Sequence, residues 1–194
     1  LPAGHIFGSA MSLVEAGGES LLYTGDFKLR ASLSAELCQP HRADVLIMET
    51  TFGRPSYVFP PAEEVIANML TFCRETLALR KIPVLLGYSL GKSQEILSGL
   101  KDAGLPVMLH AQAAKLTRIY ESFGVVFPEW RELDEATATG HVVIAPPGTP
   151  ATALCSRLAD CRFAVLTGWA LESGARFRYR AAAAFPLRDH ADFP

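Results

Sequence analysis

The sequence predicts an α/β protein in which a doubly wound, mostly parallel sheet is inserted into a second, incomplete domain. Between about residues 55 and 182, short apolar runs alternate with amphipathic segments, as in strands joined by crossover helices. The proline-rich stretch "RPSYVFPP" marks a break before this region. Polar residues of the kind that form sites gather outside it. These observations indicate one α/β domain placed within another domain.

The first residues predict a β-hairpin. The apolar runs "IFGSAMSLVEA" and "SLLYTGDF" flank "GGES", and a glycine pair between such runs is typical of a hairpin turn. A hairpin here would bring His5 and Asp26 side by side, where an imidazole and a carboxylate could share a metal ion. The alternative is that Asp26 caps a turn and His5 is an ordinary loop residue. The next run, "ADVLIMETTFG", predicts a buried strand that leads into a loop carrying Glu49.

The inserted region predicts four helices and four strands in alternation. A Pro-Ala-Glu-Glu start is typical of a first helical turn, and Gly104 and Gly124 each end a helix. Strands that alternate with helices imply right-handed crossovers, a parallel sheet and helices on both of its faces. The expected helices are 61–81, 90–104, 113–124 and 151–160, and the expected strands are 82–89, 105–111, 140–148 and 162–170.

Composition limits the class of protein. Hydrophobic residues make up 49% and charged residues 20%, which is ordinary for a globular chain, and no apolar run is long enough to cross a bilayer. No secretory signal is visible, and the four cysteines form no CxxC pair, so a reducing, cytoplasmic setting without disulfides or a zinc knuckle is expected. With a net charge of −2, nucleic-acid binding would need a local basic surface.

Polar residues at strand ends indicate metal-dependent hydrolysis. The stretches "GHIFGSA", "YTGDF", "METTFG" and "RDHADF" combine histidines with carboxylates, as a two-metal hydrolase requires. In "LLGYSLGKSQEIL", a glycine turn after a strand opens a helix near Ser89 and Lys92. That arrangement could bind a phosphate, although the P-loop spacing is absent and a simple capped helix start is the alternative.

A basic stretch follows in "GARFRYR". If this stretch were an extended strand, Arg176, Arg178 and Arg180 would share one face, with Phe177 and Tyr179 between them. Three guanidinium groups on one face could track phosphates. The alternative is a solvated strand edge protected by charge.

Taken in order, "AGHIFGSAMSLVE", "LLYTGDF", "DVLIMETTFG", "YSLGKSQEIL" and "DHADF" resemble the β-CASP branch of the metallo-β-lactamase superfamily. These nucleases process messenger RNA 3′ ends or trim DNA, and the sequence looks most like the bacterial exonucleases associated with DNA ligase. The resemblance implies a partial metallo-β-lactamase αββα sandwich over 1–54, an inserted β-CASP domain over 55–182, and a return to the first domain over 183–194.

The resemblance also implies roles for individual residues. His5 would bind one zinc ion, Asp26 would bridge two, and Glu49 would orient a histidine. His190 would protonate the leaving oxygen, since an imidazole titrates near neutral pH. Apart from the resemblance, Asp192 lies close to His190 in the sequence and could orient it or help to hold metal. The residues that would hold the substrate backbone are Ser89, Lys92, Arg176, Arg178 and Arg180.

The function so implied is zinc-dependent phosphodiester hydrolysis, by a DNA exonuclease of a repair pathway. DNA is favoured over RNA, a DNA ligase or helicase of the same pathway is a candidate partner, and no membrane is involved. The family's HxHxDH motif and its final zinc-binding histidine do not occur in these 194 residues. We therefore expect a fragment that holds little or no zinc and is inactive alone, cut from a parent with two zinc ions. An exposed sheet edge and apolar face should result.

Three alternatives remain open at this stage. The chain could be a catalytically dead module that binds nucleic acid or another protein, or it could be an RNA-processing nuclease. A small-molecule hydrolase of the wider superfamily is the third, but the inserted domain and the pairing of Glu49 with His190 argue against it.

Overall fold

The computed structural model of the chain describes residues 1–148, 154, 157–158 and 160–192, and it divides into two compact units. The first unit is Leu1–Phe59 with Arg188–Pro194, and the second is Pro60–Leu187. The sequence had placed these boundaries after residues 54 and 182. The chain leaves the second unit after Leu187, later than predicted. The reason is that strand β9 (Ala183–Phe185) pairs in parallel with β8 (Cys161–Leu166) inside the second unit.

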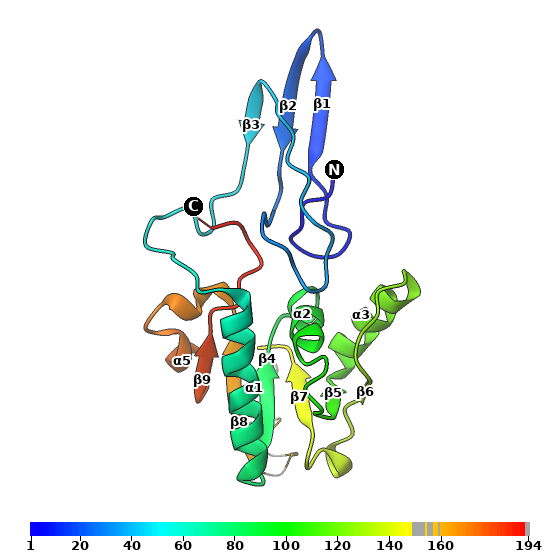
Figure 1. Cartoon of the computed structure of the whole chain (residues 1–194), viewed down its shortest axis with the longest axis vertical. Helices are drawn as coiled ribbons and strands as arrows, with labels where there is room; N and C mark the ends of the chain where they lie inside the picture. Colours follow the sequence, from blue (N-terminus) through cyan, green and yellow to red (C-terminus); the bar gives the residue numbers. More distant parts are fainter. Residues whose placement is uncertain (149–153, 155–156, 159, 193–194) are drawn as a thin grey trace. The chain divides into compact units, whose positions relative to one another are not determined.

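The first unit contains the predicted hairpin, drawn in blue in Figure 1. Strands β1 (Ser12–Ala16) and β2 (Glu19–Tyr23) pair antiparallel, which confirms the prediction. Gly17 and Gly18 form the turn with φ of 62° and 87°, a left-handed backbone that glycine adopts without steric cost. One small core cluster of this unit contains Ala3, Met11, Leu22 and Phe27, and Phe52 and Phe59 are buried as well.

Strand β3 (Val45–Ile47) pairs in parallel with β2. The sequence predicted a buried strand here, but β3 is exposed. Its three apolar residues are each at least 50% exposed. β3 is the edge of a three-stranded sheet, and no further layer covers it within the described part of the chain. The exposed edge and apolar face that the resemblance implied are therefore present.

The second unit is an α/β domain built on a six-stranded sheet in the order β6-β5-β7-β4-β8-β9. Every pairing in this sheet is parallel, which confirms the predicted type of sheet. The sequence missed β6 and assigned β9 to the other domain. The remaining elements of this unit are α1 (Ala62–Ala78), β4 (Ile82–Leu86), α2 (Lys92–Gly99), β5 (Val107–Leu109), α3 (Ala111–Ser122), β6 (Trp130–Glu132), η1 (Glu135–Thr137), β7 (Val142–Ala145), η2 (Gly168–Leu171) and α5 (Ala175–Arg178).

The two faces of this sheet are covered differently. Leu85 of β4 belongs to a core cluster shared with α1, α2 and α3, so these three helices lie over one face. In Figure 1, α1 runs alongside β4 and β8. Val84 faces a second cluster that includes Ala138, Leu158 and Tyr179. The helix expected over 151–160 falls largely outside the described residues, so a helix on this second face stays a prediction.

Within the described residues, no helix combines the length and apolar character needed to cross a membrane.

Candidate active site

Gly4 allows the chain to pass close to the segment that follows β2. Its φ is +74°, and a Cβ at this position would lie 2.4 Å from the backbone oxygen of Lys28. No other residue fits there without displacement of the backbone. The Lys28 N–H donates to the Ala3 carbonyl at 2.9 Å, and this bond fixes the approach. His5, the next residue, is thereby held near Asp26.

His5 and Asp26 face each other in a geometry that suits a shared cation. The distance from His5 Nε2 to Asp26 Oδ2 is 3.9 Å. His5 Nδ1 lies 2.9 Å from the Asp189 carbonyl oxygen, which can only accept, so Nδ1 carries the proton and the Nε2 lone pair faces the carboxylate. Metal-binding histidines are oriented in this way, and two ligand atoms on a tetrahedral zinc ion lie about 3.4 Å apart.

His190 is held by a carboxylate. Its Nδ1 lies 3.0 Å from Oε1 of Glu49, and the Thr51 N–H donates to Oε2 of the same side chain at 2.7 Å. Burial raises the pKa of Glu49, but hydrogen bonds from Thr51 and His190 outweigh it and lower that pKa below its usual value. Glu49 is therefore ionised at neutral pH and accepts the Nδ1 proton of His190. The Nε2 atom of His190 is then the ring nitrogen that can act on a substrate or bind a metal ion.

The structure gathers His5, Asp26 and His190 into one cluster. One candidate ligand atom from each lies within 4.8 Å of the others, and the two imidazole rings are 4.6 Å apart between centroids. Two imidazoles and a carboxylate are donors that zinc prefers, so the cluster fits one ion. The sequence had named His5 and Asp26 as ligands. His190 is a third candidate, brought in from a position 185 residues after His5 along the chain.

The loop that carries His190 is fixed at both ends. The guanidinium of Arg188 donates to Asp192 Oδ2 at 2.7 Å and lies 5.0 Å from the centre of the Phe59 ring. Arg30 approaches the same carboxylate at 3.5 Å, and the Ala191 N–H donates to the Phe27 carbonyl. Asp192 therefore binds arginines, and not His190 as predicted. From the sequence, Arg188 was noted only as a further basic residue after "GARFRYR", with no sign of its bond to Asp192.

The sequence predicted that Lys92, at the start of α2, binds a phosphate. The structure contradicts this role. Lys92 is only 1% exposed, and its Nζ donates to Glu95 Oε2 and to the Leu187 carbonyl, both at 2.9 Å. The Gly91 N–H is bonded to the Gln94 side chain, and the Ser93 N–H to the Tyr88 carbonyl. The helix start is thus closed by internal hydrogen bonds. Ser89 lies half-buried in the loop before it.

The three arginines do not share a strand face, because residues 175–178 form the short helix α5. Successive residues of a helix are turned by about 100°, so residues two apart lie on nearly opposite sides. Arg178 pairs with Glu172 at 3.8 Å, while Arg176 and Arg180 remain exposed. The prediction of one basic face on an extended strand was wrong.

Curated relatives share this sequence over part of their length. The chain is 58% identical over 193 residues, 99% of its length, to 19% of a protein named "Probable DNA ligase" from Opitutus terrae. It is 30% identical over 62% of its length to 21% of "Transcription termination factor FttA" from Methanococcus maripaludis. It is 34% identical over 50% of its length to 11% of "Endoribonuclease ysh-1" from Neurospora crassa.

Of these three relatives, the Neurospora crassa protein is named as a nuclease, the Opitutus terrae protein as a ligase of DNA and the Methanococcus maripaludis protein as a factor in transcription termination. The chain spans about a fifth or less of the length of each of the three relatives. No family model matches the chain. A crystal structure of a protein of unknown function from Enterococcus faecalis V583 matches 99% of the chain and 52% of that protein, with a TM-score of 0.61. At 12% identity, this match bears on the fold alone.

Proposed function

We propose that this chain is part of a metal-dependent nuclease of the β-CASP branch of the metallo-β-lactamase superfamily. The grouping of His5, Asp26 and His190, with His190 hydrogen-bonded to Glu49, carries the proposal. The order of the sequence motifs and the names of the relatives support it. DNA is the preferred substrate, because the 58% identical relative is named as a probable DNA ligase. An exonuclease that acts with a ligase in repair is the activity that the resemblance of the sequence motifs implies.

In this proposal His5 and Asp26 would hold a zinc ion, His5 with its imidazole and Asp26 with its carboxylate. A bound zinc ion supplies polarisation of the scissile phosphate and lowers the pKa of a bound water. His190 holds a proton at Nε2 and delivers it to the leaving oxygen. The ionised Glu49 fixes the ring of His190 and stabilises its protonated form through Nδ1. With His190 kept for proton transfer, His5 and Asp26 are two protein ligands, fewer than a zinc site takes, so the two-zinc centre is proposed for the whole nuclease and not for this chain alone.

The zinc content of this chain, and of the longest protein that its gene encodes, tests the proposal. Plasma mass spectrometry should find two zinc ions in the longer protein and little or none in this chain. The longer protein should cleave labelled DNA, and removal of zinc by a chelator should abolish cleavage. Cleavage that persists after complete removal of metal would overturn the proposal.

Variants of the longer protein assign the roles. Loss of a direct ligand in His5→Ala or Asp26→Asn should weaken zinc binding by at least about tenfold. His190→Ala should keep the metal and lose cleavage; loss of zinc along with cleavage would instead make His190 a ligand. His41→Ala is the control, since His41 is an exposed histidine of the same unit outside the cluster.

A further inference from the structure

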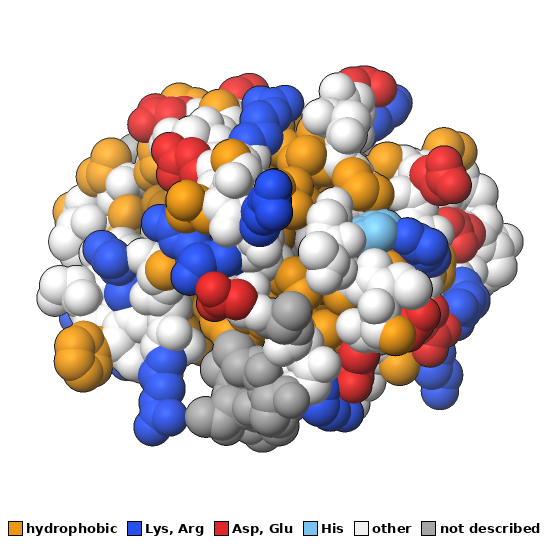
Figure 2. All heavy atoms as spheres, turned by 90° about the horizontal axis from the view of Figure 1, so that it is seen from below, with side chains coloured by type: hydrophobic (Ala, Val, Ile, Leu, Met, Phe, Trp, Pro, Cys, Tyr) orange, Lys and Arg blue, Asp and Glu red, His pale blue; other side chains and the backbone are white. Residues whose placement is uncertain are grey.

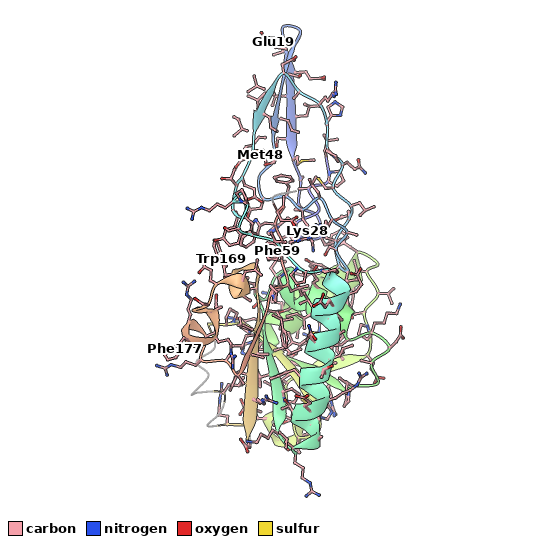
Figure 3. The ribbon with its side chains drawn as sticks, turned by 60° about the vertical axis from the view of Figure 1, so that its left-hand side comes forward. Glu19, Lys28, Met48, Phe59, Trp169 and Phe177 are labelled. Carbon is pink, nitrogen blue, oxygen red and sulfur yellow. The ribbon has the colours of Figure 1, made fainter. Side chains whose placement is uncertain are left out.

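Helix α5 presents an aromatic ring to solvent. Ala175 is 4% exposed and Tyr179 packs against a core cluster, so positions 175 and 179 form the buried side of this turn. Phe177 lies on the opposite side and is 92% exposed (Figure 3). Such exposure of a phenylalanine leaves a large apolar area in water, and its burial against a partner would be favourable.

Two arginines beside this ring have no acidic partner in the part of the chain that the structure describes. Arg178 pairs with Glu172, but Arg176 and Arg180 form no ion pair with any residue that the structure describes. On the face seen in Figure 2, basic side chains are interspersed with acidic and apolar ones. With a net charge of −2 for the chain, the positive charge around Phe177 is a local feature. We name Arg176, Phe177 and Arg180 the α5 patch.

Arg180 occupies a position that favours glycine. It follows the C-cap residue Tyr179 of α5 with φ of 48°. Its N–H donates to the Phe177 carbonyl, and the Ala181 N–H donates to the Arg176 carbonyl. This is a Schellman motif, in which glycine has the lower conformational cost. Arg80 ends α1 in the same way, with φ of 59°. The chain therefore offers two exposed arginines in one backbone setting, of which only Arg180 adjoins an exposed phenylalanine.

We propose that the α5 patch binds single-stranded nucleic acid, with a base stacked on Phe177 and phosphates held by Arg176 and Arg180. The proposal rests on the proposed function for the class of ligand. An exposed ring accepts any base face, and guanidinium groups match phosphate oxygens. A duplex keeps its bases stacked on one another and offers the ring no free base face, so a single strand fits the patch.

The test is binding of a fluorescein-labelled oligothymidylate to the full chain, by fluorescence anisotropy in EDTA so that no metal-dependent cleavage occurs. Phe177→Ala should weaken binding by about fivefold or more. Phe177→Trp should preserve binding, whereas Phe177→Leu should lose it, because leucine is apolar but does not stack. Phe123→Ala is the matched control: Phe123 is 72% exposed, and its nearest charged neighbour in sequence is Glu121. Circular dichroism checks that each variant is folded.

Salt dependence tests the arginines. Arg176→Gln and Arg180→Gln should each lower the slope of log affinity against log salt by about 0.7. Arg178→Gln should change it less, because Glu172 already pairs with Arg178. Arg180→Gly and Arg80→Gly relieve the same backbone conformation, but only Arg180→Gly should weaken binding.

The proposal is overturned if the α5 variants bind as tightly as the Phe123→Ala and Arg80→Gly controls. It is also overturned if a duplex binds equally well and loses the same affinity in Phe177→Ala. Neither outcome affects the zinc and cleavage measurements on the His5, Asp26 and His190 variants, so failure of the patch is distinguishable from failure of the nuclease proposal.

Discussion

Lys92 is a charged residue whose burial decides its role. It lies with Glu95 in the interior of the second unit, and these side chains are 1% and 5% exposed. A buried ion pair is stable only while both partners are present, since a lone buried charge has lost its water without compensation. Lys92 therefore holds Glu95 and the Leu187 carbonyl, and its charge is not available to a substrate phosphate.

Lys92→Met should destabilise the protein by about 3–5 kcal/mol, because it leaves Glu95 buried without its partner. Urea unfolding followed by circular dichroism measures the loss. Lys115→Met is the control, since Lys115 is an exposed lysine on α3, and it should change the free energy of unfolding very little. Normal stability of Lys92→Met together with weakened binding of an oligonucleotide would restore the phosphate role.

At the scale of elements, a close backbone approach forms the site. His5 precedes the hairpin, and Asp26 follows it. The chain can bring them to 3.9 Å because Gly4 lets the backbone pass within contact of Lys28. The loop of residues 188–192 then adds His190, through the hydrogen bond between His5 and the Asp189 carbonyl.

Comparing Gly4→Ala with Gly8→Ala separates the free-energy cost of a steric clash from the cost of a strained backbone conformation. Both glycines have positive φ, but a Cβ at Gly8 meets nothing within 4 Å. Gly8→Ala should cost about 1 kcal/mol, and Gly4→Ala should add a steric cost of about 1–3 kcal/mol. Urea unfolding measures both values. Gly4→Ala should also weaken zinc binding, because it displaces His5; equal effects of the two substitutions would contradict this account of Gly4.

At the scale of the whole molecule, the two units differ in the size of their cores. Among the described residues, the first unit buries six apolar side chains, all named above, and its strand β3 is exposed. The second unit has two large clusters, on the two faces of a parallel sheet. Burial of apolar area is the main source of stability, so the second unit should be the more stable.

Hydrogen exchange of the chain alone should show this difference. Amides of β1, β2 and β3 should exchange well before those of β4, β7 and β8, because the small unit opens at lower free energy. Mass spectrometry of peptides from each unit provides the measurement. Equal protection in both sets of strands would contradict the inference from core size.

Local patterns in the sequence were enough for the hairpin and for the α/β domain. Gly17 and Gly18 between two apolar runs specify the turn, and the alternation of strand and helix patterns specifies a parallel sheet. The juxtaposition of His5 and Asp26 followed from the hairpin. These features depend on neighbours in sequence, where turn chemistry and hydrophobic period act directly.

Tertiary packing decided the rest. "RFRYR" alternates like a strand, but Ala175 and Tyr179 pack inward at helical spacing, and that contact makes the segment a helix. An apolar run such as β3 predicts burial, yet burial also needs a covering layer. The charge of Lys92 could be read from the sequence, but its burial and its pairing with Glu95 could not. The sequence by itself determined the hairpin and the alternation of strands and helices in the second unit, because turns and hydrophobic periods are local. The structure decided which charged groups remain exposed, because exposure depends on residues distant along the chain.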